Sequence, residues 1–359
     1  MLKQLLTVSL MFFFSVILAF QTSSIPVDGY PWRLDVIEKD GVSYLAVIDR
    51  IDSQFILVNT STFEQNAIPL PLYPSDLLVK DGVVYVTTVE EGKIVEVDPF
   101  AATVTREVAT GKHVFRFLDG AGTGGFRVLS MDGTLLDFDA DLNITGVYNL
   151  PRFSLDVAFW GDYLISLNSE NYETIWGKFF EGGETGVYIQ NLSTGETYEF
   201  YGGKIPSWIH VNDDRLYSLS YWDGYLVAFT EDLQIAGEIE TGAKVNSPLW
   251  MEDYCYLLDF DDSELVKIDL RNFEVENRVK LSGRGPVVLE KIGRYFFVLN
   301  VLDDSVDVVS ADSMTVEAHV AVGKYPIDIV KIDEHRAAVA CEESGEIFLL
   351  WYNNPTNPR

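Results

Sequence analysis

The stretch Val320-Ala-Val-Gly-Lys-Tyr-Pro-Ile-Asp-Ile-Val330 decides the fold of this chain, because degenerate copies of it return along the sequence. We take its proline, Pro326, as the anchor of one repeat. The equivalent anchors of the earlier copies are Pro31, Pro74, Val114, Ser154, Pro206, Val245 and Pro286. Successive anchors are 43, 40, 40, 52, 39, 41 and 40 residues apart. A unit of about 40 residues therefore organises the chain, and eight anchors indicate eight repeats.

Each repeat has the pattern of four short strands separated by turns. In the second repeat the strands are expected at residues 75–80, 83–88, 93–98 and 103–109, with turn residues such as Asp81-Gly82 between them. After residue 20, no stretch long enough for a helix has helical periodicity. Four-stranded units repeated at this spacing are typical of a β-propeller, in which each unit is one blade. We therefore expect an all-β fold, a single propeller of eight blades.

The two ends of the chain are expected to close the ring together. The last repeat supplies strands at residues 327–332, 337–341 and 346–351, but the chain then ends in Asn353-Asn-Pro-Thr-Asn-Pro-Arg359, whose prolines oppose a fourth strand. At the other end, Ile25-Pro-Val-Asp-Gly-Tyr-Pro31 aligns with residues 320–326. An N-terminal strand should therefore complete the C-terminal blade and leave no blade with an unpaired edge.

The repeats resemble those of the YVTN-repeat β-propellers over about residues 25–351. The resemblance rests on Gly323-Lys-Tyr-Pro-Ile-Asp-Ile-Val330, on third strands such as Asp303-Asp-Ser-Val-Asp-Val-Val309, and on the Val-Ala-Val-Gly ending. The name-giving tetrapeptide appears in looser form as Tyr85-Val-Thr-Thr88 and Phe297-Val-Leu-Asn300. The resemblance implies an exported or cell-surface protein of bacteria or archaea, acting as a binding module without a shared catalytic set. The family is often seven-bladed, so seven is the alternative count.

The N-terminal segment differs from the rest, because Lys3 is its only charge and residues 5–20 are almost entirely apolar. A charged start followed by a short apolar run is typical of a secretory signal peptide, whereas a membrane span needs about 20 apolar residues. Cleavage is expected after Ala19 or a few residues later, with an uncleaved N-terminal anchor as the alternative. The chain then divides into residues 1–20 as leader, 21–351 as propeller and 352–359 as tail. We expect a secreted, periplasmic or cell-surface protein.

The formal net charge is −29, from 55 acidic and 26 basic residues. A field of this sign repels phosphate backbones, so we expect no nucleic-acid partner. The acidity is explained either by a solvated surface or by attraction of cations or a basic partner. The two cysteines, Cys255 and Cys341, fall in apolar strands two blades apart, so no disulfide is expected although export would permit one. We expect a monomer whose only membrane tether would be the N-terminal segment.

One mouth of the central channel is the expected site, because the starts of the first strands and the turns between second and third strands lie on one face of a propeller. Two residues after the anchors, the repeats carry Arg33, Asp76, Arg116, Asp156, Trp208, Ser247, Val288 and Asp328. From Asp328 around the ring to Asp156, neighbours alternate in charge. The residues one and three positions after the anchors are mostly apolar, so strand alternation places the charged set on a different side from them. The charged set forms either a belt of ion pairs between blades or a polar binding arc.

Aromatic residues add a second set to the same half of the ring. Directly before the anchors stand Tyr30, Tyr73, His113, Phe153 and Tyr325. The longest repeat leaves a loop at residues 169–185 that holds Trp176, and the Tyr221-Trp222 turn belongs to the next repeat. A loop of this length is usually functional or disordered, and we expect a packed hairpin or a lid over the mouth. The aromatic residues either pack between blades or form a stacking surface for a sugar or peptide.

The sequence contains neither G-x-S-x-G nor H-E-x-x-H, and its four histidines fall in separate repeats or strands. An arginine beside each aspartate of the charged set argues against a divalent metal there. We therefore expect no catalytic residue, no metal and no cofactor. The preferred function is a non-enzymatic module that binds an unknown small molecule, glycan or protein through the mouth. The alternative is an enzyme at the same mouth, either a lactonase-like hydrolase or a quinoprotein-type oxidoreductase.

Overall fold

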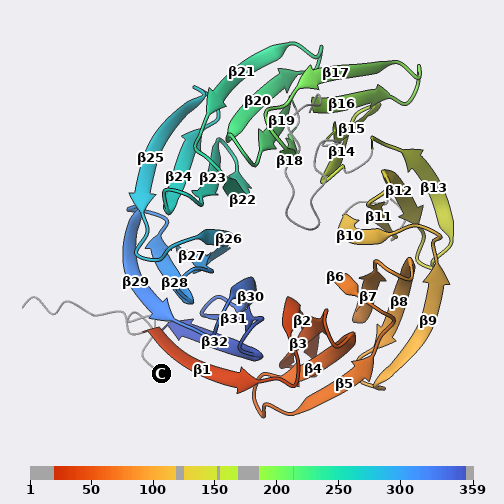
Figure 1. The fold of residues 1–359 in the computed structure, drawn as a ribbon, viewed down its shortest axis with the longest axis vertical. Coiled ribbons are helices and arrows are strands. Elements are labelled where there is room, and N and C mark those ends of the chain that lie inside the picture. Colours follow the sequence, from red (N-terminus) through yellow and green to blue (C-terminus); the bar gives the residue numbers. More distant parts are fainter. Residues whose placement is uncertain (1–19, 119–124, 152–153, 169–185, 213, 353–359) are drawn as a thin grey trace, which may run out of the picture.

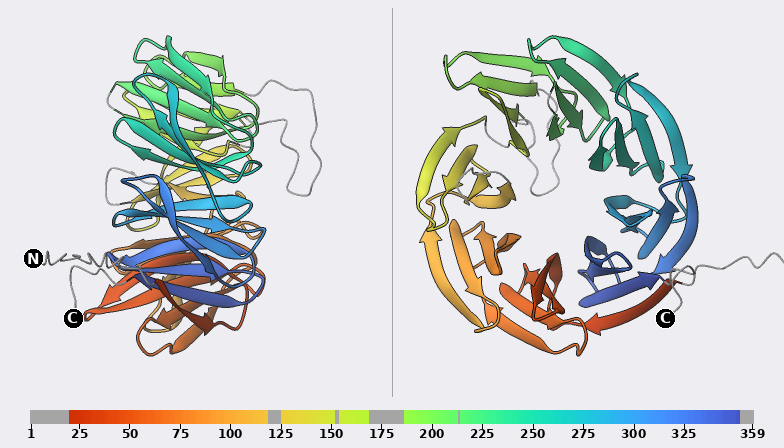
Figure 2. Two further views of the ribbon diagram at one scale, coloured as in Figure 1. Left: turned by 90° about the vertical axis from the view of Figure 1, so that its left-hand side faces the viewer. Right: turned by 180° about the vertical axis from the view of Figure 1, so that it is seen from behind.

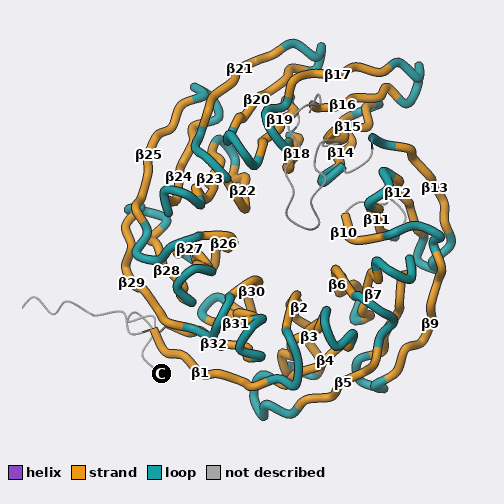
Figure 3. The backbone as a smooth tube through the Cα atoms, in the orientation of Figure 1, coloured by secondary structure: helices purple, strands orange, loops and turns teal. Residues whose placement is uncertain are grey.

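The computed structural model describes residues 20–118, 125–151, 154–168, 186–212 and 214–352. Within these ranges the chain forms 32 strands and no helix, arranged as eight four-stranded sheets around one centre (Figures 1 and 3). The prediction of an all-β propeller with eight blades is therefore confirmed. No helix with the length and apolar character needed to cross a membrane occurs in the part of the chain that the structure describes.

Blades 1 to 4 follow one another along the chain, each with its first strand innermost (Figure 1). Blade 1 consists of β2 (Pro31–Lys39), β3 (Val42–Asp49), β4 (Gln54–Asn59) and β5 (Gln65–Pro69). Blade 2 consists of β6 (Pro74–Lys80), β7 (Val83–Thr88), β8 (Lys93–Asp98) and β9 (Thr103–Ala109). Blade 3 consists of β10 (Val114–Leu118), β11 (Phe126–Ser130), β12 (Thr134–Phe138) and β13 (Ile144–Asn149). Blade 4 consists of β14 (Val157–Trp160), β15 (Tyr163–Asn168), β16 (Gly186–Asn191) and β17 (Thr197–Tyr201).

Blades 5 to 8 complete the ring, and the last of them takes its outer strand from the other end of the chain. Blade 5 consists of β18 (Pro206–Val211), β19 (Arg215–Ser220), β20 (Tyr225–Thr230) and β21 (Ile235–Glu240). Blade 6 consists of β22 (Val245–Met251), β23 (Tyr254–Asp259), β24 (Glu264–Asp269) and β25 (Glu274–Lys280). Blade 7 consists of β26 (Pro286–Ile292), β27 (Tyr295–Asn300), β28 (Ser305–Ser310) and β29 (Thr315–Ala321). Blade 8 consists of β30 (Pro326–Asp333), β31 (Arg336–Cys341), β32 (Glu346–Tyr352) and β1 (Phe20–Pro26).

The hydrophobic core lies between neighbouring sheets. One cluster, for example, joins Leu45 and Val47 of blade 1 to Ala338 and Ile347 of blade 8. The middle strands are covered on both faces, so that every side chain of β27 and β28 is buried. The outer strand β29 instead alternates between exposed and half-buried side chains, as expected for a strand with one face in water. Radial packing of sheet against sheet therefore supplies most of the apolar burial.

Strand β1 closes the ring by pairing antiparallel with β32, with Ile25 opposite Ile347. Both views of the ring show β1 beside β32 at the closure (Figures 1 and 2). Ile25 is 1% exposed, and the ring of Phe20 packs edge-on against Tyr295 and Phe297 of blade 7. The predicted closure is confirmed, and the paired strands extend one residue beyond the predicted propeller bounds at each end.

The anchor residues mark where the inner strands begin. All eight are buried, and seven of them open an inner strand. Several are prolines, which are tolerated at the first residue of an edge strand because no ladder hydrogen bond is lost. In six blades the pairing of inner and second strands shifts directly after the anchor, as between Pro31 and Arg33. Such a bulge sets two residues of one strand against one of its partner, and it alters which side chains face the channel.

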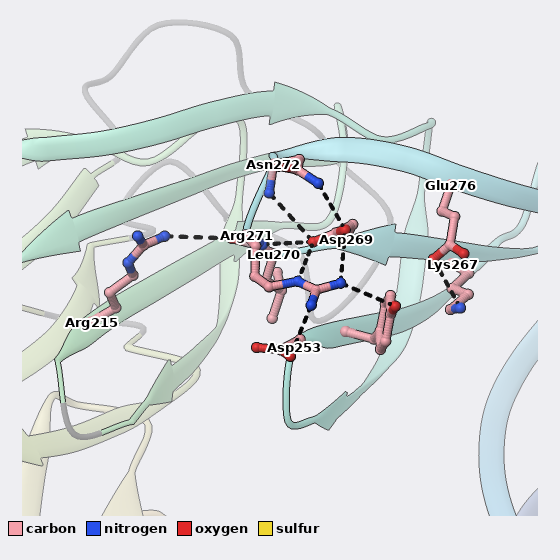
Figure 4. A network of polar contacts seen from close by, with 9 residues as sticks. Arg215, Asp253, Lys267, Asp269, Leu270, Arg271, Asn272 and Glu276 are labelled. Carbon is pink, nitrogen blue, oxygen red and sulfur yellow. Dashed lines mark hydrogen bonds and ion pairs between the residues drawn. The ribbon is translucent and has the colours of Figure 1, made fainter.

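A polar network at the turn between β24 and β25 links blades 5 and 6 on the face opposite the mouth (Figure 4). Arg271 pairs with Asp253 at 3.4 Å and with Asp269 at 3.2 Å. Its hydrogen bond lowers the pKa of Asp269 to about 2. Arg215 of β19 donates to the Leu270 carbonyl at 3.4 Å, which connects the two blades. This network orders a turn far from the predicted site.

Both cysteines are buried and unpaired, Cys255 in blade 6 and Cys341 in blade 8. The prediction that they form no disulfide is confirmed. Burial raises the pKa of both thiols, that of Cys341 to about 12. Because the thiolate is the reactive form, these residues act as small core side chains.

Removal of a buried β1 side chain should weaken the closure of the ring. Ile25→Ala is expected to lower the free energy of unfolding by about 2 to 4 kcal/mol, the usual cost of such a truncation in a core. Ser24→Ala, at the exposed neighbouring position, should change it by less than about 0.5 kcal/mol. Urea unfolding followed by tryptophan fluorescence measures both. Equal stabilities of the two variants would contradict closure through β1.

Candidate functional site

The turns between second and third strands meet the inner strands on one face of the ring, as the sequence predicted. In six blades, the backbone N–H just after the second strand donates to the carbonyl of the residue before the anchor. These bonds join Val89 to Tyr73, Met131 to His113, Tyr221 to Ile205, Phe260 to Lys244, Val301 to Gly285 and Glu342 to Tyr325 at 2.8 to 3.4 Å. We call this side the mouth face.

Acceptor side chains two residues after the anchors join neighbouring inner strands. Asp76 of β6 accepts a hydrogen bond from the N–H of Leu77 at 3.1 Å and another from the N–H of Phe117 in β10 at 2.8 Å. The same bond to the next blade joins Asp156 to Ile209 at 2.9 Å, Asp328 to Leu34 at 2.8 Å and Ser247 to Leu289 at 3.0 Å. Each inner strand is the free edge of its sheet, so its N–H groups need acceptors. The carboxylates supply them.

Two arginines occupy positions between these acceptors. Arg33 Nη1 lies 3.6 Å from Asp328 Oδ1, and Arg116 Nη1 lies 3.6 Å from Asp156 Oδ1. Arg116 also donates to the Leu155 carbonyl at 2.8 Å. Both arginine side chains are 40% exposed. The predicted ion pairs between blades are therefore present, but they are long, and both guanidinium groups reach water.

Burial dominates the pKa values of the three aspartates in this set. It raises the pKa of Asp76, Asp156 and Asp328, in the last case to about 6. The positive charges of Arg33 and Arg116 oppose this rise, and both act on Asp76, which stands between them in the ring. The negative charges are therefore only partly compensated, which identifies the arginines as necessary counter-charges.

A cavity of about 530 Å³ lies in the channel beside the inner strands of blades 1 to 6. Its lining consists of Arg33, Ser75, Asp76, Phe115, Arg116, Leu155, Ile205, Ser207, Trp208, Tyr221 and Asn246. The sequence singled out Arg33, Asp76, Arg116, Trp208 and Tyr221 as site residues, and the structure brings these five together. One side of the cavity thus carries charge, and another is aromatic.

Other predicted residues lie outside this lining. Asp156 and Asp328 are not part of it and bind inner-strand N–H groups. Tyr30 and Tyr325 are rim residues, 43% and 37% exposed. His113 is exposed, with its ring nitrogen 2.9 Å from the Val89 carbonyl. These residues surround the mouth without forming the cavity.

The remaining aromatic predictions have separate environments. Tyr73 is half-buried, with the Arg50 guanidinium 5.6 Å from its ring centroid. The Trp222 ring lies 6.4 Å from that of Tyr221 and has the Lys244 ammonium 5.6 Å from its centroid. Trp176 and Phe153 lie outside the described residues, as does the whole loop 169–185.

One inference from the sequence was wrong, because residues one position after the anchors share the cavity with the charged set. Ser75, Phe115, Leu155, Ser207 and Asn246 all occupy that position. Strict alternation would have placed them on the other side of the strand. For Ser75, Phe115 and Ser207, the bulge directly after the anchor breaks the alternation, because it leaves this residue unpaired. Leu155 precedes strand β14, and Asn246 stands directly before the shift in blade 6. A repeat-by-repeat comparison of this position would have found them only if the bulge had been anticipated.

The described residues contain no group of three or more histidine, cysteine, aspartate or glutamate side chains arranged to hold a metal ion. At the cavity, Asp76 is the one carboxylate in the lining, and both of its oxygens accept backbone hydrogen bonds. The donor set at this site therefore suits a ligand that accepts hydrogen bonds rather than a cation.

Asp328 should make the stability of the fold depend on pH. Its pKa is raised from 3.8 to about 6, so between these values the folded protein binds more protons than the unfolded chain. The contribution of Asp328 to the free energy of unfolding therefore becomes more favourable as pH falls. Asp328→Asn keeps an oxygen for the Leu34 N–H and removes the buried charge. At pH 7.5 it should stabilise the protein by roughly 3 kcal/mol, since the pKa is raised by about two units and one unit corresponds to about 1.4 kcal/mol.

At pH 4 the gain from Asp328→Asn should largely disappear. Thermal melts of wild type and variant at both pH values measure the difference, with Asp52→Asn in an exposed turn as the control. A gain that is the same at both pH values would contradict a buried, charge-bearing Asp328.

No family model matches this chain, and no curated protein matches it either. The YVTN-repeat resemblance therefore stays a prediction. Solved structures do match. Sqt1 of Saccharomyces cerevisiae aligns with a TM-score of 0.69 at 10% identity, covering 91% of this chain and 96% of that one. BamB from Moraxella catarrhalis aligns with a TM-score of 0.64 at 15% identity, covering 93% and 100%.

The dihydro-heme d1 dehydrogenase NirN, solved in complex with DHE, aligns with a TM-score of 0.63 at 16% identity. This match covers 83% of the present chain and 67% of NirN. At these identities the likeness concerns the fold alone. The chain is thus an eight-bladed β-propeller similar in shape to proteins of different activities.

Proposed function

We propose that this propeller is a non-enzymatic binding protein that takes a small ligand into the cavity of its mouth face. The observation that carries the proposal is the cavity itself, whose lining contains two arginines and the aromatic side chains Phe115, Trp208 and Tyr221. Its volume of about 530 Å³ falls within the range of about 300 to 1,000 Å³ that is usual for small-molecule sites. Few convergent polar groups beside apolar side chains are the general pattern of such sites.

The carboxylates of the site support binding over acid–base catalysis. A general acid or base must reach the proton that it transfers. Asp76 instead gives both oxygens to the backbone N–H groups of Leu77 and Phe117. Asp156 likewise bridges Val157 and Ile209. Their role in holding inner strands together leaves the arginines and aromatic residues to contact a ligand.

Loss of the aromatic wall should abolish ligand binding without unfolding the ring. Wild type is screened by thermal shift against monosaccharides, dipeptides and aromatic carboxylates. A ligand at 100 times its dissociation constant stabilises by about 2.7 kcal/mol, a shift of a few degrees. Trp208→Leu should remove that shift, because indole contact area is lost.

The control for Trp208→Leu is Tyr201→Leu, which removes an exposed aromatic ring of outer strand β17. It should leave the ligand-induced shift unchanged. A shift that survives Trp208→Leu, or that Tyr201→Leu removes equally, would place binding outside the cavity.

We also propose that the protein is exported and that its leader is removed at or before the bond between Ala19 and Phe20. Phe20 begins β1 and packs against Tyr295 and Phe297, so later cleavage would remove a ring contact. Intact mass of the protein recovered from the medium or cell envelope should correspond to a chain that retains Phe20. A mature chain that lacks Phe20, or protein found only in the cytoplasm, would contradict this.

A further inference from the structure

The cavity presents more hydrogen-bond donors than acceptors to a ligand. Among the described residues, the Arg33 guanidinium makes no hydrogen bond, and its ion pair with Asp328 is 3.6 Å long. Arg116 uses one donor on the Leu155 carbonyl. A guanidinium carries five N–H donors and no acceptor. Most donors of the two arginines are therefore left for a ligand that is rich in acceptor atoms.

The other polar side chains of the lining have most of their donors, and both oxygens of Asp76, bonded within the protein. Both oxygens of Asp76 accept backbone N–H groups. The hydroxyl of Ser207 donates to the Ile205 carbonyl, and that of Ser75 donates to the Phe115 carbonyl. Asn246 donates to the Lys244 carbonyl and keeps its amide oxygen. The two hydroxyl oxygens and the Asn246 amide oxygen keep acceptor capacity, but the N–H donors of the two arginines outnumber them. The balance of the lining therefore favours a ligand that carries a carboxylate.

The rest of the lining is apolar and includes large flat rings. Trp208, Phe115 and Tyr221 lie in it with Leu155 and Ile205. Trp208 is half-buried, and its indole N–H has no hydrogen bond within the described part of the chain. Aromatic side chains favour stacked or edge-on contact with another ring, so this wall suits a flat apolar body.

We propose that the cavity binds a small aromatic carboxylate, whose carboxylate group is held by Arg33 and Arg116 and whose ring packs against Trp208 and Phe115. This inference rests on the proposed binding function and names its ligand class. Planar guanidinium groups match the two oxygens of a carboxylate. The contribution of a charge-assisted bond exceeds that of a neutral one, so the negative charge of the ligand should dominate its affinity.

The overall charge of −29 does not prevent such binding. Exposed charges beyond about 8 Å are largely screened at physiological ionic strength, while the guanidinium groups contact the ligand directly. The opposing local charges are Asp328 and Asp156, each 3.6 Å from one arginine, and Asp76, which both arginines face. Asp76→Asn would remove that charge and keep an oxygen for the Phe117 N–H, so it should tighten binding of an anion.

The test titrates the full-length mature protein with matched ligands. These are benzoate and indole-3-carboxylate, and their neutral amides benzamide and indole-3-carboxamide. Isothermal titration should show the carboxylates binding at least tenfold more tightly than the amides. Arg33→Gln and Arg116→Gln should each weaken the carboxylates by tenfold or more and leave the amides nearly unchanged. Asp76→Asn should tighten the carboxylates about threefold. Trp208→Leu should weaken indole-3-carboxylate more than acetate, which is added as a carboxylate probe without a ring.

Two further variants serve as controls, one for loss of any exposed positive charge and one for loss of the Arg33 charge itself. Arg284→Gln removes an exposed cation of the rim outside the cavity and should leave all affinities unchanged. Arg33→Lys keeps the positive charge near Asp328 and should retain the fold, while losing part of the carboxylate affinity because an ammonium lacks the planar pair of donors. Circular dichroism of each variant confirms that the propeller is intact.

The results separate this inference from the broader function. The aromatic-carboxylate assignment is overturned if the amides bind as tightly as the carboxylates. It is also overturned if neither Arg33→Gln nor Arg116→Gln changes the affinity for the carboxylates. If a neutral ligand from the screen binds and depends on Trp208, the assignment fails and the binding function stands. If no probe and no ligand of the screen binds, both fail.

Discussion

The structure depends on how the inner edge of each sheet satisfies its backbone. A strand at the edge of a sheet has N–H groups that point away from its partner, and in this ring those edges face the channel. Side chains two residues after the anchors accept from the next blade, as Asp76 does from Phe117 at 2.8 Å. These bonds place carboxylates at fixed positions around the centre. The other side chains of the mouth that could contact a ligand lie around these carboxylates.

Burial of these carboxylates in turn requires counter-charges. Desolvation raises the pKa of Asp328 to about 6 in spite of Arg33. Each arginine therefore lowers the free-energy cost of burying these negative charges. The ion pairs are nevertheless 3.6 Å long, and the guanidinium groups remain partly in water. The arginines thus serve both the ring and the cavity. The two readings of the charged set, a belt of ion pairs and a binding arc, describe different atoms of the same residues.

The fold could be predicted almost completely from the sequence, because a repeat copies the same strands eight times and errors in one copy are corrected by the others. The anchor at Pro326 and the pairing of Ile25 with Ile347 both follow from that periodicity. The site was predicted in part. Arg33 and Trp208 were found since strand alternation points them inward, but Phe115 and Ser207 were missed because a bulge overrides alternation. A bulge leaves no residue signature of its own in this chain.

At the position two residues after the anchors, acceptors for the next blade occur in every second blade: Asp76 in blade 2, Asp156 in blade 4, Ser247 in blade 6 and Asp328 in blade 8. Arg33 and Arg116 hold alternate places between them. Duplication of a single blade from blade 8 round to blade 4, or deletion of blade 1, 2 or 3, would set two buried carboxylates, or two guanidinium groups, next to each other. Gain or loss of two neighbouring blades within this arc would keep the charges alternating, so there the pair of blades is the unit that can change without electrostatic conflict.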